Sequence, residues 1–209
     1  SKGKPYIIAT GSSTLLEVKQ AYKTAIKINK NIGIMQCNTN YTANSKNYDY
    51  INLNVLKTYK KLFPKAVLGL SDHTFGHATV LGAITLGARI IEKHFTLDNY
   101  LIGPDHKFSM NPKTWKEMIL RSRELERSLG SKIKKIELNE KDTVVVQRRS
   151  IHANKFLKKD HIIKKKDLIF LRPCPKQGIE PYKFQKIIGK KVKQSIQKDE
   201  IITLKKIFS

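Results

Sequence analysis

The first part of the chain alternates short apolar runs with longer segments of helical periodicity. Apolar runs of strand length occur at residues 6–9, 32–37 and 67–70, and a fourth begins at residue 90. Almost continuously apolar strands with helices between them are typical of a parallel sheet that is covered on both faces. The pattern therefore predicts an α/β fold in which residues 6–9 form a short buried strand.

Helical patterns follow each of these runs. Apolar residues recur at intervals of three and four in residues 15–28, 51–63, 77–86 and 115–129. Ser13 or Thr14 is placed to cap the first helix, and Gly130 is placed to end the last one. Four β/α units fit half of a (β/α)₈ barrel, because a complete barrel needs roughly 250 residues. A small doubly wound sheet fits the same pattern, and the residues alone leave both architectures open.

The pattern changes after residue 130. Residues 131–146 are rich in charge and predict a linker. Beyond the linker, short apolar segments alternate with Lys-rich turns and with several prolines and glycines. The segments are residues 150–153, 169–171 and 192–196. These features predict a small second domain of short strands and turns.

Composition allows a well-formed core and makes the chain strongly basic. Hydrophobic residues make up 40% of the 209 residues, but no apolar run is long enough for a membrane-spanning helix. The 41 lysines and arginines outnumber the 17 acidic residues and give a net charge of +24. Such a balance is common in nucleic-acid-binding proteins. The excess is mostly lysine and is spread along the chain, whereas bases are usually read by arginine and aromatic side chains. We therefore expect a solvated basic surface that attracts anionic substrates, with neither a nucleic acid nor a membrane as partner.

Cysteine content indicates the compartment. Cys37 and Cys174 are the only two cysteines, which is too few for a disulfide framework. No signal-peptide pattern precedes the first predicted strand. Both observations favour a reduced, cytoplasmic setting.

Two predicted strands end in polar clusters that contain a histidine. Gly-Leu-Ser-Asp-His-Thr occupies residues 69–74, and Ile-Ile-Glu-Lys-His-Phe-Thr occupies residues 90–96, so His73 and His94 follow successive strands. Barrel enzymes hold their chemistry at the carboxyl ends of parallel strands. Two imidazoles there suit a divalent metal ion, although strand-end histidines that merely bond to neighbours would look the same.

Several motifs in order resemble the sialic acid synthase family, which includes the legionaminic and pseudaminic acid synthases. Besides the two histidine runs, they are Gly-Pro-Asp-His-Lys at 103–107 and Arg-Arg-Ser-Ile at 148–151. Shorter matches are Arg172-Pro173, Gly178-Ile179 and Ile188-Gly189-Lys190. The resemblance covers the whole chain, including a region similar to the family's antifreeze-like (SAF, β-clip) domain.

The resemblance implies a fold class and a domain organisation. The fold class is α/β, the C-terminal half of a (β/α)₈ TIM barrel followed by a small SAF domain. Residues 1–130 are then a partial synthase barrel, residues 131–146 a linker and residues 147–209 the SAF domain. The usual assembly of the family implies a swapped homodimer, in which each small domain covers its partner's barrel mouth.

The resemblance also implies an activity. Family members condense phosphoenolpyruvate with an N-acetylated hexosamine, such as N-acetylmannosamine or a related 2,4-diacetamido sugar. The products are a nine-carbon 2-keto acid and phosphate. A divalent metal, Mn²⁺ or Mg²⁺, is the implied cofactor, and it would polarise the sugar aldehyde for attack by phosphoenolpyruvate. The motif at 103–107 looks more like the neuraminic and legionaminic branches than the pseudaminic one.

Catalytic roles follow from the matched motifs. His73 and His94 resemble the family's two metal ligands. Asp105 matches an acidic residue that contacts the open-chain sugar near the reacting carbon, although an aspartate after Pro104 is also an ordinary turn residue. In a strand, Lys93 points away from the side of Glu92 and His94, so no direct catalytic role is assigned to either flanking residue.

Substrate contacts follow in the same way. Ser71 resembles a contact to phosphoenolpyruvate, and Tyr41 matches a tyrosine in the sugar pocket. Thr39 stands where the family has a phosphate-contacting serine or asparagine, and its hydroxyl can still donate. Arg172 resembles the arginine that reaches into the partner's active site and holds the sugar's N-acetyl group. Ala9 departs from the pattern, because a serine commonly contacts phosphoenolpyruvate at that position.

The matched region begins near the fifth barrel strand of the family. The expectation is therefore a fragment or a split gene product that is inactive on its own. Two alternatives remain: a sugar- or metal-binding remnant without catalysis, and a basic nucleic-acid-binding protein.

Overall fold

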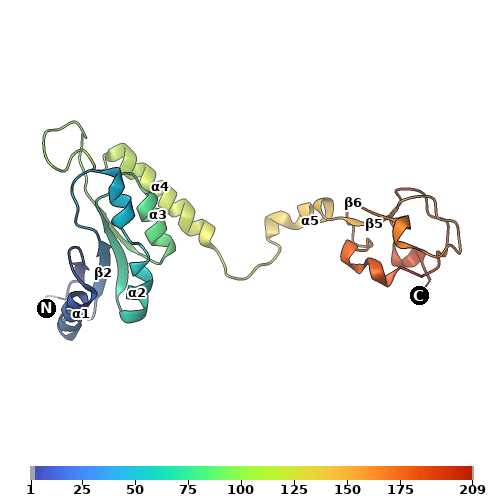
Figure 1. Cartoon of the computed structure of the whole chain (residues 1–209), viewed down its shortest axis with the longest axis horizontal. Helices are drawn as coiled ribbons and strands as arrows, with labels where there is room; N and C mark the ends of the chain where they lie inside the picture. The colour runs from blue at the N-terminus through green and yellow to red at the C-terminus, as the bar shows by residue number, and fades with distance from the viewer. Residues whose placement is uncertain (1–2, 209) are drawn as a thin grey trace. The chain divides into compact units, whose positions relative to one another are not determined.

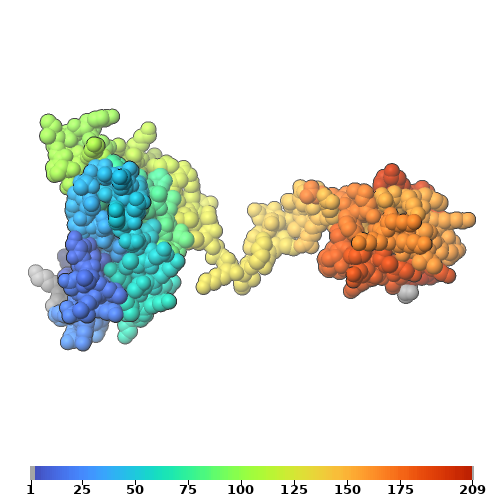
Figure 2. Space-filling view, in the orientation of Figure 1, coloured from blue at the N-terminus to red at the C-terminus, as the bar shows by residue number. Residues whose placement is uncertain are grey.

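The computed structural model describes residues 3–208, which fold into two compact units that divide between Ser131 and Lys132 (Figure 1; Figure 2). Residues 1, 2 and 209, which the predicted domains include, lie outside the described residues. Each unit has its own hydrophobic core. Within residues 3–208, no helix is both long and apolar enough to cross a membrane.

The first unit contains a four-stranded parallel sheet of order β1-β2-β3-β4. The strands are β1 (Tyr6–Ala9), β2 (Ile32–Cys37), β3 (Val67–Asp72) and β4 (Ile90–Lys93). Their helices are α1 (Leu15–Ile28), α2 (Val55–Leu62), α3 (Ala78–Thr85) and α4 (Pro112–Leu129), and the short helix η1 (Ser45–Tyr50) precedes α2. The predicted α/β architecture of successive β/α units is confirmed.

Local capping explains where the two longest helices begin. Thr14 accepts a hydrogen bond from the Glu17 amide, and the Glu17 carboxylate accepts one from the Thr14 amide. Asn111 and Thr114 form the equivalent reciprocal pair at the start of α4. Such capping boxes satisfy amides that have no partner within the helix. Gly130 follows α4 with φ of 48°, a conformation that other residues rarely adopt.

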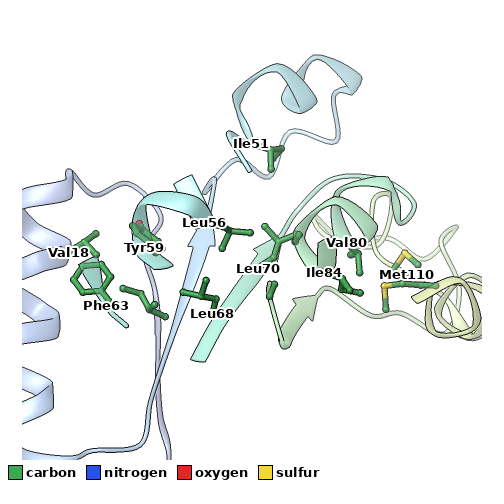
Figure 3. Close-up of a cluster of buried hydrophobic side chains, with 14 residues drawn as sticks. Val18, Ile51, Leu56, Tyr59, Phe63, Leu68, Leu70, Val80, Ile84 and Met110 are labelled. Carbon is green, nitrogen blue, oxygen red and sulfur yellow. The ribbon is translucent and has the colours of Figure 1, made fainter. Parts of the chain in front are cut away.

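Helices pack on one face of the sheet and bury its apolar side chains (Figure 3). Leu68 and Leu70 of β3 lie in one cluster with Leu56 of α2, Val80 of α3 and Met118 of α4. Each such side chain contributes about 1.5–3 kcal/mol on burial. Figure 1 shows α3 beside α4, in agreement with their many contacts.

Two expectations in the first unit were wrong. The strand at 6–9 is not buried, since Tyr6 is 55% and Ile7 47% exposed on an edge strand. The helix predicted from residue 51 begins only at Val55, because Asn52 has a φ of 50° that is incompatible with a right-handed helix. Ile51 is apolar for another reason: it is buried in the core.

The second unit is built from short elements around its own core. They are η2 (Leu138–Glu140), α5 (Lys141–Gln147), β5 (Ser150–Ala153), η3 (Lys165–Asp167), β6 (Leu168–Leu171), η4 (Pro181–Lys186) and η5 (Leu204–Lys206). Strands β5 and β6 are antiparallel. Of the three apolar segments, residues 150–153 and 169–171 lie in β5 and β6, whereas Val192 and Ile196 form only isolated bridges. Residues 131–146, expected to be a linker, include η2 and most of α5.

Candidate active site

Strand alternation places the candidate residues on one side of the sheet. Ser71 lies within β3, and His73 follows two residues later; Glu92 and His94 have the same spacing at the end of β4. Side chains two residues apart in a strand share a face. The parallel pairing of Ser71 with Glu92 brings the two strand ends together. The ring centroids of His73 and His94 are consequently 5.1 Å apart.

Aromatic rings surround the histidine pair. The Tyr41 ring lies 4.4 Å from His73 and 5.5 Å from His94, measured between centroids. Phe108 lies 5.1 Å from His94 and is only 2% exposed. Sequence reasoning missed Phe108, although an aromatic residue in the otherwise polar loop after Asp105 was a visible signal. The rings hold both imidazoles in a partly apolar environment.

Neighbouring oxygens determine which imidazole nitrogen remains available. The Asn38 carbonyl lies 3.0 Å from His73 Nδ1. Because a carbonyl only accepts hydrogen bonds, Nδ1 carries the hydrogen and Nε2 of the neutral ring keeps its lone pair. Asp105 Oδ2 lies 3.4 Å from His94 Nδ1 and favours the same tautomer. Metal-binding histidines commonly have this kind of oxygen partner on the second nitrogen.

Hydrogen bonds within the loop position Asp105. Asn99 donates to the carbonyls of His106 and Ser109, at 2.7 and 2.8 Å. Ser109 in turn donates from its amide and its hydroxyl to the Asp105 carbonyl. The Asp105 side chain remains 45% exposed and accessible to a ligand. The irregular loop is therefore folded around the carboxylate that faces His94.

Ser71 has a partner that the sequence did not identify. Its hydroxyl donates to Glu92 Oε1 at 2.7 Å. Ser71 is buried, whereas Glu92 is exposed on the same face as the two histidines. The bond therefore orients Ser71 at the floor of the site. Strand alternation predicts that Glu92 lies on this face, but it does not predict the hydrogen bond to Ser71.

Thr39 lines a separate polar hollow at the ends of β1 and β2. The hollow has a volume of about 870 Å³, and none of its lining side chains is charged. Its lining residues are Thr10, Ser12, Ser13, Thr14, Leu15, Gln36, Cys37, Asn38, Thr39, Asn40, Tyr50, Asn52, Asn54, Val55, Thr58 and Tyr59. Tyr59 donates to Thr10, and burial raises the pKa of this phenol. Thr39 and Tyr41 thus come from one loop, but Thr39 lines the hollow while Tyr41 contacts the histidines.

Arg172 belongs to the second unit. Its side chain is exposed, and its Nε donates to the Gln147 carbonyl at 2.8 Å. The structure therefore brings His73, His94, Tyr41 and Asp105 together, with Ser71 on the same face.

The two imidazoles fit a divalent ion as a partial ligand set. Residues 3–208 contain no group of three or more histidine, cysteine or acidic side chains arranged for a metal. A metal at His73 and His94 would therefore complete its coordination with water or substrate oxygens. The available Nε2 lone pairs are common ligands of divalent metal ions, and water and substrate oxygens are the ligands that Mn²⁺ and Mg²⁺ prefer for the remaining positions.

Comparison with known proteins identifies the family to which this chain belongs. The model of the NeuB family matches residues 1–134, and the model of the SAF domain matches residues 148–207. The chain therefore belongs to the NeuB family, and its second unit carries a SAF domain. The predicted fold class, the C-terminal half of a TIM barrel followed by a SAF domain, is confirmed.

Individual relatives agree with this assignment. The N,N'-diacetyllegionaminic acid synthase of Legionella pneumophila is 38% identical across 94% of this chain and 55% of its own length. The synthase of the same name from Campylobacter jejuni is 34% identical across 95% of this chain and 59% of its own. The crystal structure of spore coat polysaccharide biosynthesis protein SpsE from Bacillus subtilis aligns with a TM-score of 0.56 at 31% identity. That alignment covers 99% of this chain and 62% of SpsE. The chain thus spans a little over half the length of these relatives.

Proposed function

We propose that this chain carries part of the active site of a synthase that condenses phosphoenolpyruvate with an N-acetylated hexosamine. A carbon–carbon bond forms between C3 of phosphoenolpyruvate and the aldehyde carbon of the open-chain sugar. One water is consumed, phosphate leaves, and a nine-carbon 2-keto acid results. The observation that carries the proposal is the convergence of His73, His94, Tyr41 and Asp105 at one edge of a half-barrel sheet. The similarity to two N,N'-diacetyllegionaminic acid synthases supports the same class of chemistry.

His73 and His94 would hold Mn²⁺ or Mg²⁺ through Nε2, since an oxygen faces Nδ1 of each ring. Such an ion supplies Lewis-acid polarisation of a carbonyl oxygen when bound. Asp105, oriented by His94, accepts a hydrogen bond from a sugar hydroxyl near the reacting carbon. The tyrosine ring of Tyr41 borders the sugar and limits access of water.

Hydroxyl groups would hold the anionic substrate. Ser71 stands at the floor of the site with its hydroxyl on Glu92, and it reorients toward an arriving phosphate or carboxylate. Thr39 supplies a second hydroxyl at the edge of the uncharged hollow. The net charge of +24 adds a long-range field that attracts a multiply charged anion.

Metal titration tests the first part of the proposal. Binding of Mn²⁺ is followed by electron paramagnetic resonance in the unaltered chain and in the His73→Ala and His94→Ala variants. We expect binding by the unaltered chain and its loss in both variants. His77→Ala, at the start of α3, is the matched control and should bind Mn²⁺ normally. An unchanged Mn²⁺ signal in His73→Ala would overturn the metal assignment.

Product analysis tests the chemistry itself. The chain is incubated with phosphoenolpyruvate, Mn²⁺ and a panel of N-acetylhexosamines, with the first half barrel of the Campylobacter jejuni synthase supplied in trans. Phosphate and 2-keto acid should form together, and only when a hexosamine is present. Phosphate release that is independent of the sugar, or turnover that survives His73→Ala, would contradict the proposed reaction. Metal binding without turnover by any sugar would favour a binding remnant.

We propose that the protein acts as a swapped homodimer in which Arg172 holds the N-acetyl group of the sugar in the partner's site. Residues 132–209 carry 22 basic and 8 acidic side chains, and residues 1–131 carry 19 and 9. Both units are positive, so docking one on the other is opposed at low salt. Sedimentation equilibrium should show tighter dimers as salt rises from ~10 mM to ~150 mM. Strictly monomeric behaviour at all salt concentrations would exclude this assembly.

A further inference from the structure

A buried ion pair joins β3 to β4 on the side of the sheet opposite the histidines. Lys93 Nζ lies 2.6 Å from Asp72 Oδ2, and the two side chains are 1% and 0% exposed. The Asp72 carboxylate also accepts hydrogen bonds from the Thr74 amide and hydroxyl and from the Thr79 hydroxyl. Lys93 donates a second hydrogen bond to the Thr74 carbonyl at 2.7 Å. Both charges are therefore paired and hydrogen-bonded in the packed interior.

The pair occupies the two positions that immediately precede the histidines. Asp72 comes directly before His73, and Lys93 comes directly before His94. The two residues are also register partners in the parallel pairing of β3 with β4. Because neighbouring side chains in a strand point to opposite faces, the ion pair lies behind the site rather than in it. Each histidine is thus attached to a backbone position that the pair fixes.

We infer that Asp72 and Lys93 are positioning residues that set the separation and orientation of His73 and His94. This inference rests on the proposed metal role of the histidines. Strands β3 and β4 pair with each other as far as Asp72 and Lys93, and beyond Lys93 the chain pairs with Met110, whose amide donates to the His94 carbonyl at 2.8 Å. The pair and the bond from Lys93 to the Thr74 carbonyl join the two strand ends directly before the imidazoles, whose ring centroids are 5.1 Å apart. Burial matters here, since a paired charge in the interior has few alternative partners.

A double variant separates this role from simple folding. In Asp72→Asn with Lys93→Met, both charges are removed together, which buried ion pairs often tolerate. We expect the variant to remain folded by circular dichroism but to bind Mn²⁺ at least ~10-fold more weakly, as when outer-shell partners of ligands are lost. In metal-free protein, nuclear Overhauser contacts between the His73 and His94 rings should weaken as well. That second measurement needs no metal, so it reports on positioning even if the metal assignment fails.

Matched controls identify the pair itself as the cause. Thr79→Val removes the hydrogen bonds of the Thr79 hydroxyl to Asp72 and to the Thr74 hydroxyl but leaves the ion pair, so Mn²⁺ affinity should stay within about twofold of the unaltered chain. Asp167→Asn breaks the ion pair between a buried carboxylate and the half-exposed Lys155 in the second unit and should leave Mn²⁺ affinity unchanged. Unaltered Mn²⁺ affinity and intact ring contacts in the folded double variant would overturn the inference. Absence of Mn²⁺ binding by the unaltered chain would instead refute the proposed metal role.

Discussion

Close backbone approach at Gly11 determines where the Thr39 hydroxyl lies. A Cβ atom at position 11 would lie 1.7 Å from Thr39 Oγ1 and 3.0 Å from Cys37 Sγ. Gly11→Ala should therefore displace Thr39 and lower the free energy of unfolding of the first unit by about 1–3 kcal/mol. Urea unfolding measures the change.

The double variant Gly11→Ala with Thr39→Ala isolates the contact. Removing the hydroxyl should recover part of the lost stability, which a double-mutant cycle detects as a favourable coupling. Equal destabilisation with and without Thr39→Ala would show that the crowding lies elsewhere.

Asp167 makes the second unit sensitive to acid. Burial by itself raises the pKa of the Asp167 carboxyl. Hydrogen bonds from His161 and the Lys164 amide and the ion pair with Lys155 outweigh this effect and lower the pKa to about 2. A group with a lowered folded pKa stabilises above its unfolded pKa of about 3.9, and this stabilisation is lost as the pH falls toward 2. Between about pH 4.5 and 2, the unaltered chain should lose about 2 kcal/mol more stability than Asp167→Asn.

Urea unfolding at several pH values tests this dependence, with Asp160→Asn at an exposed turn as the control. The control should follow the pH curve of the unaltered chain. Parallel curves for Asp167→Asn and the unaltered chain would contradict the assigned role of Asp167.

At the level of single residues, sequence patterns predicted which face of the sheet a side chain occupies better than which residue it contacts. Alternation placed Lys93 opposite Glu92 and His94, which the structure agrees with, but it gave no indication of Asp72 as its partner. The meeting of Asp105 with His94 depends on how Asn99 folds a long irregular loop. Such contacts arise from tertiary hydrogen bonding, which spacing along the chain does not encode.

At the level of elements, strands were the most predictable because their apolar runs are short and bounded by polar residues. Strand β2 occupies the predicted residues, and β3 and β4 extend the predicted runs into the polar clusters. Helix α2 was less predictable, since Ile51 is apolar for core packing and Asn52 turns the chain before the helix. In the second unit, Val192 and Ile196 pack in the core without belonging to a strand.

The edge strand β1 leaves apolar surface that should promote self-association. Ile7 of β1 is 47% exposed, and Leu16 of the neighbouring α1 is 65% exposed. An unpaired strand edge with apolar side chains is a template for pairing with other chains. Replacing Ile7 and Leu16 with lysine should reduce aggregates larger than the proposed dimer, as measured by light scattering over a range of concentrations. Leu62→Lys, on α2, is the control and should not change the amount of aggregate. Equal aggregation of the unaltered chain, the double variant and the control would show that β1 does not promote self-association.

At the level of the whole molecule, two separate cores imply two separate unfolding transitions. Residues 130–137 form neither helix nor strand, and the two hydrophobic clusters share no residue. Domains that each have their own core unfold independently unless a large interface couples them.

Truncation of one side chain in each core tests this independence. Met118 of α4 is 2% exposed and Ile187 is fully buried, so either change to alanine should cost about 2–5 kcal/mol. Hydrogen exchange followed by mass spectrometry should show Met118→Ala weakening protection in the first unit, including β2 and β3, and Ile187→Ala weakening it in the second unit, including β5 and β6, with the other unit unchanged in each case. Conversely, weakened protection in both units from either single change would mean that they unfold as one. Each core stabilises its own part of the proposed site. Ile187→Ala should therefore leave Mn²⁺ binding at His73 and His94 intact, while it weakens the hydrogen bond that holds Arg172 to the Gln147 carbonyl.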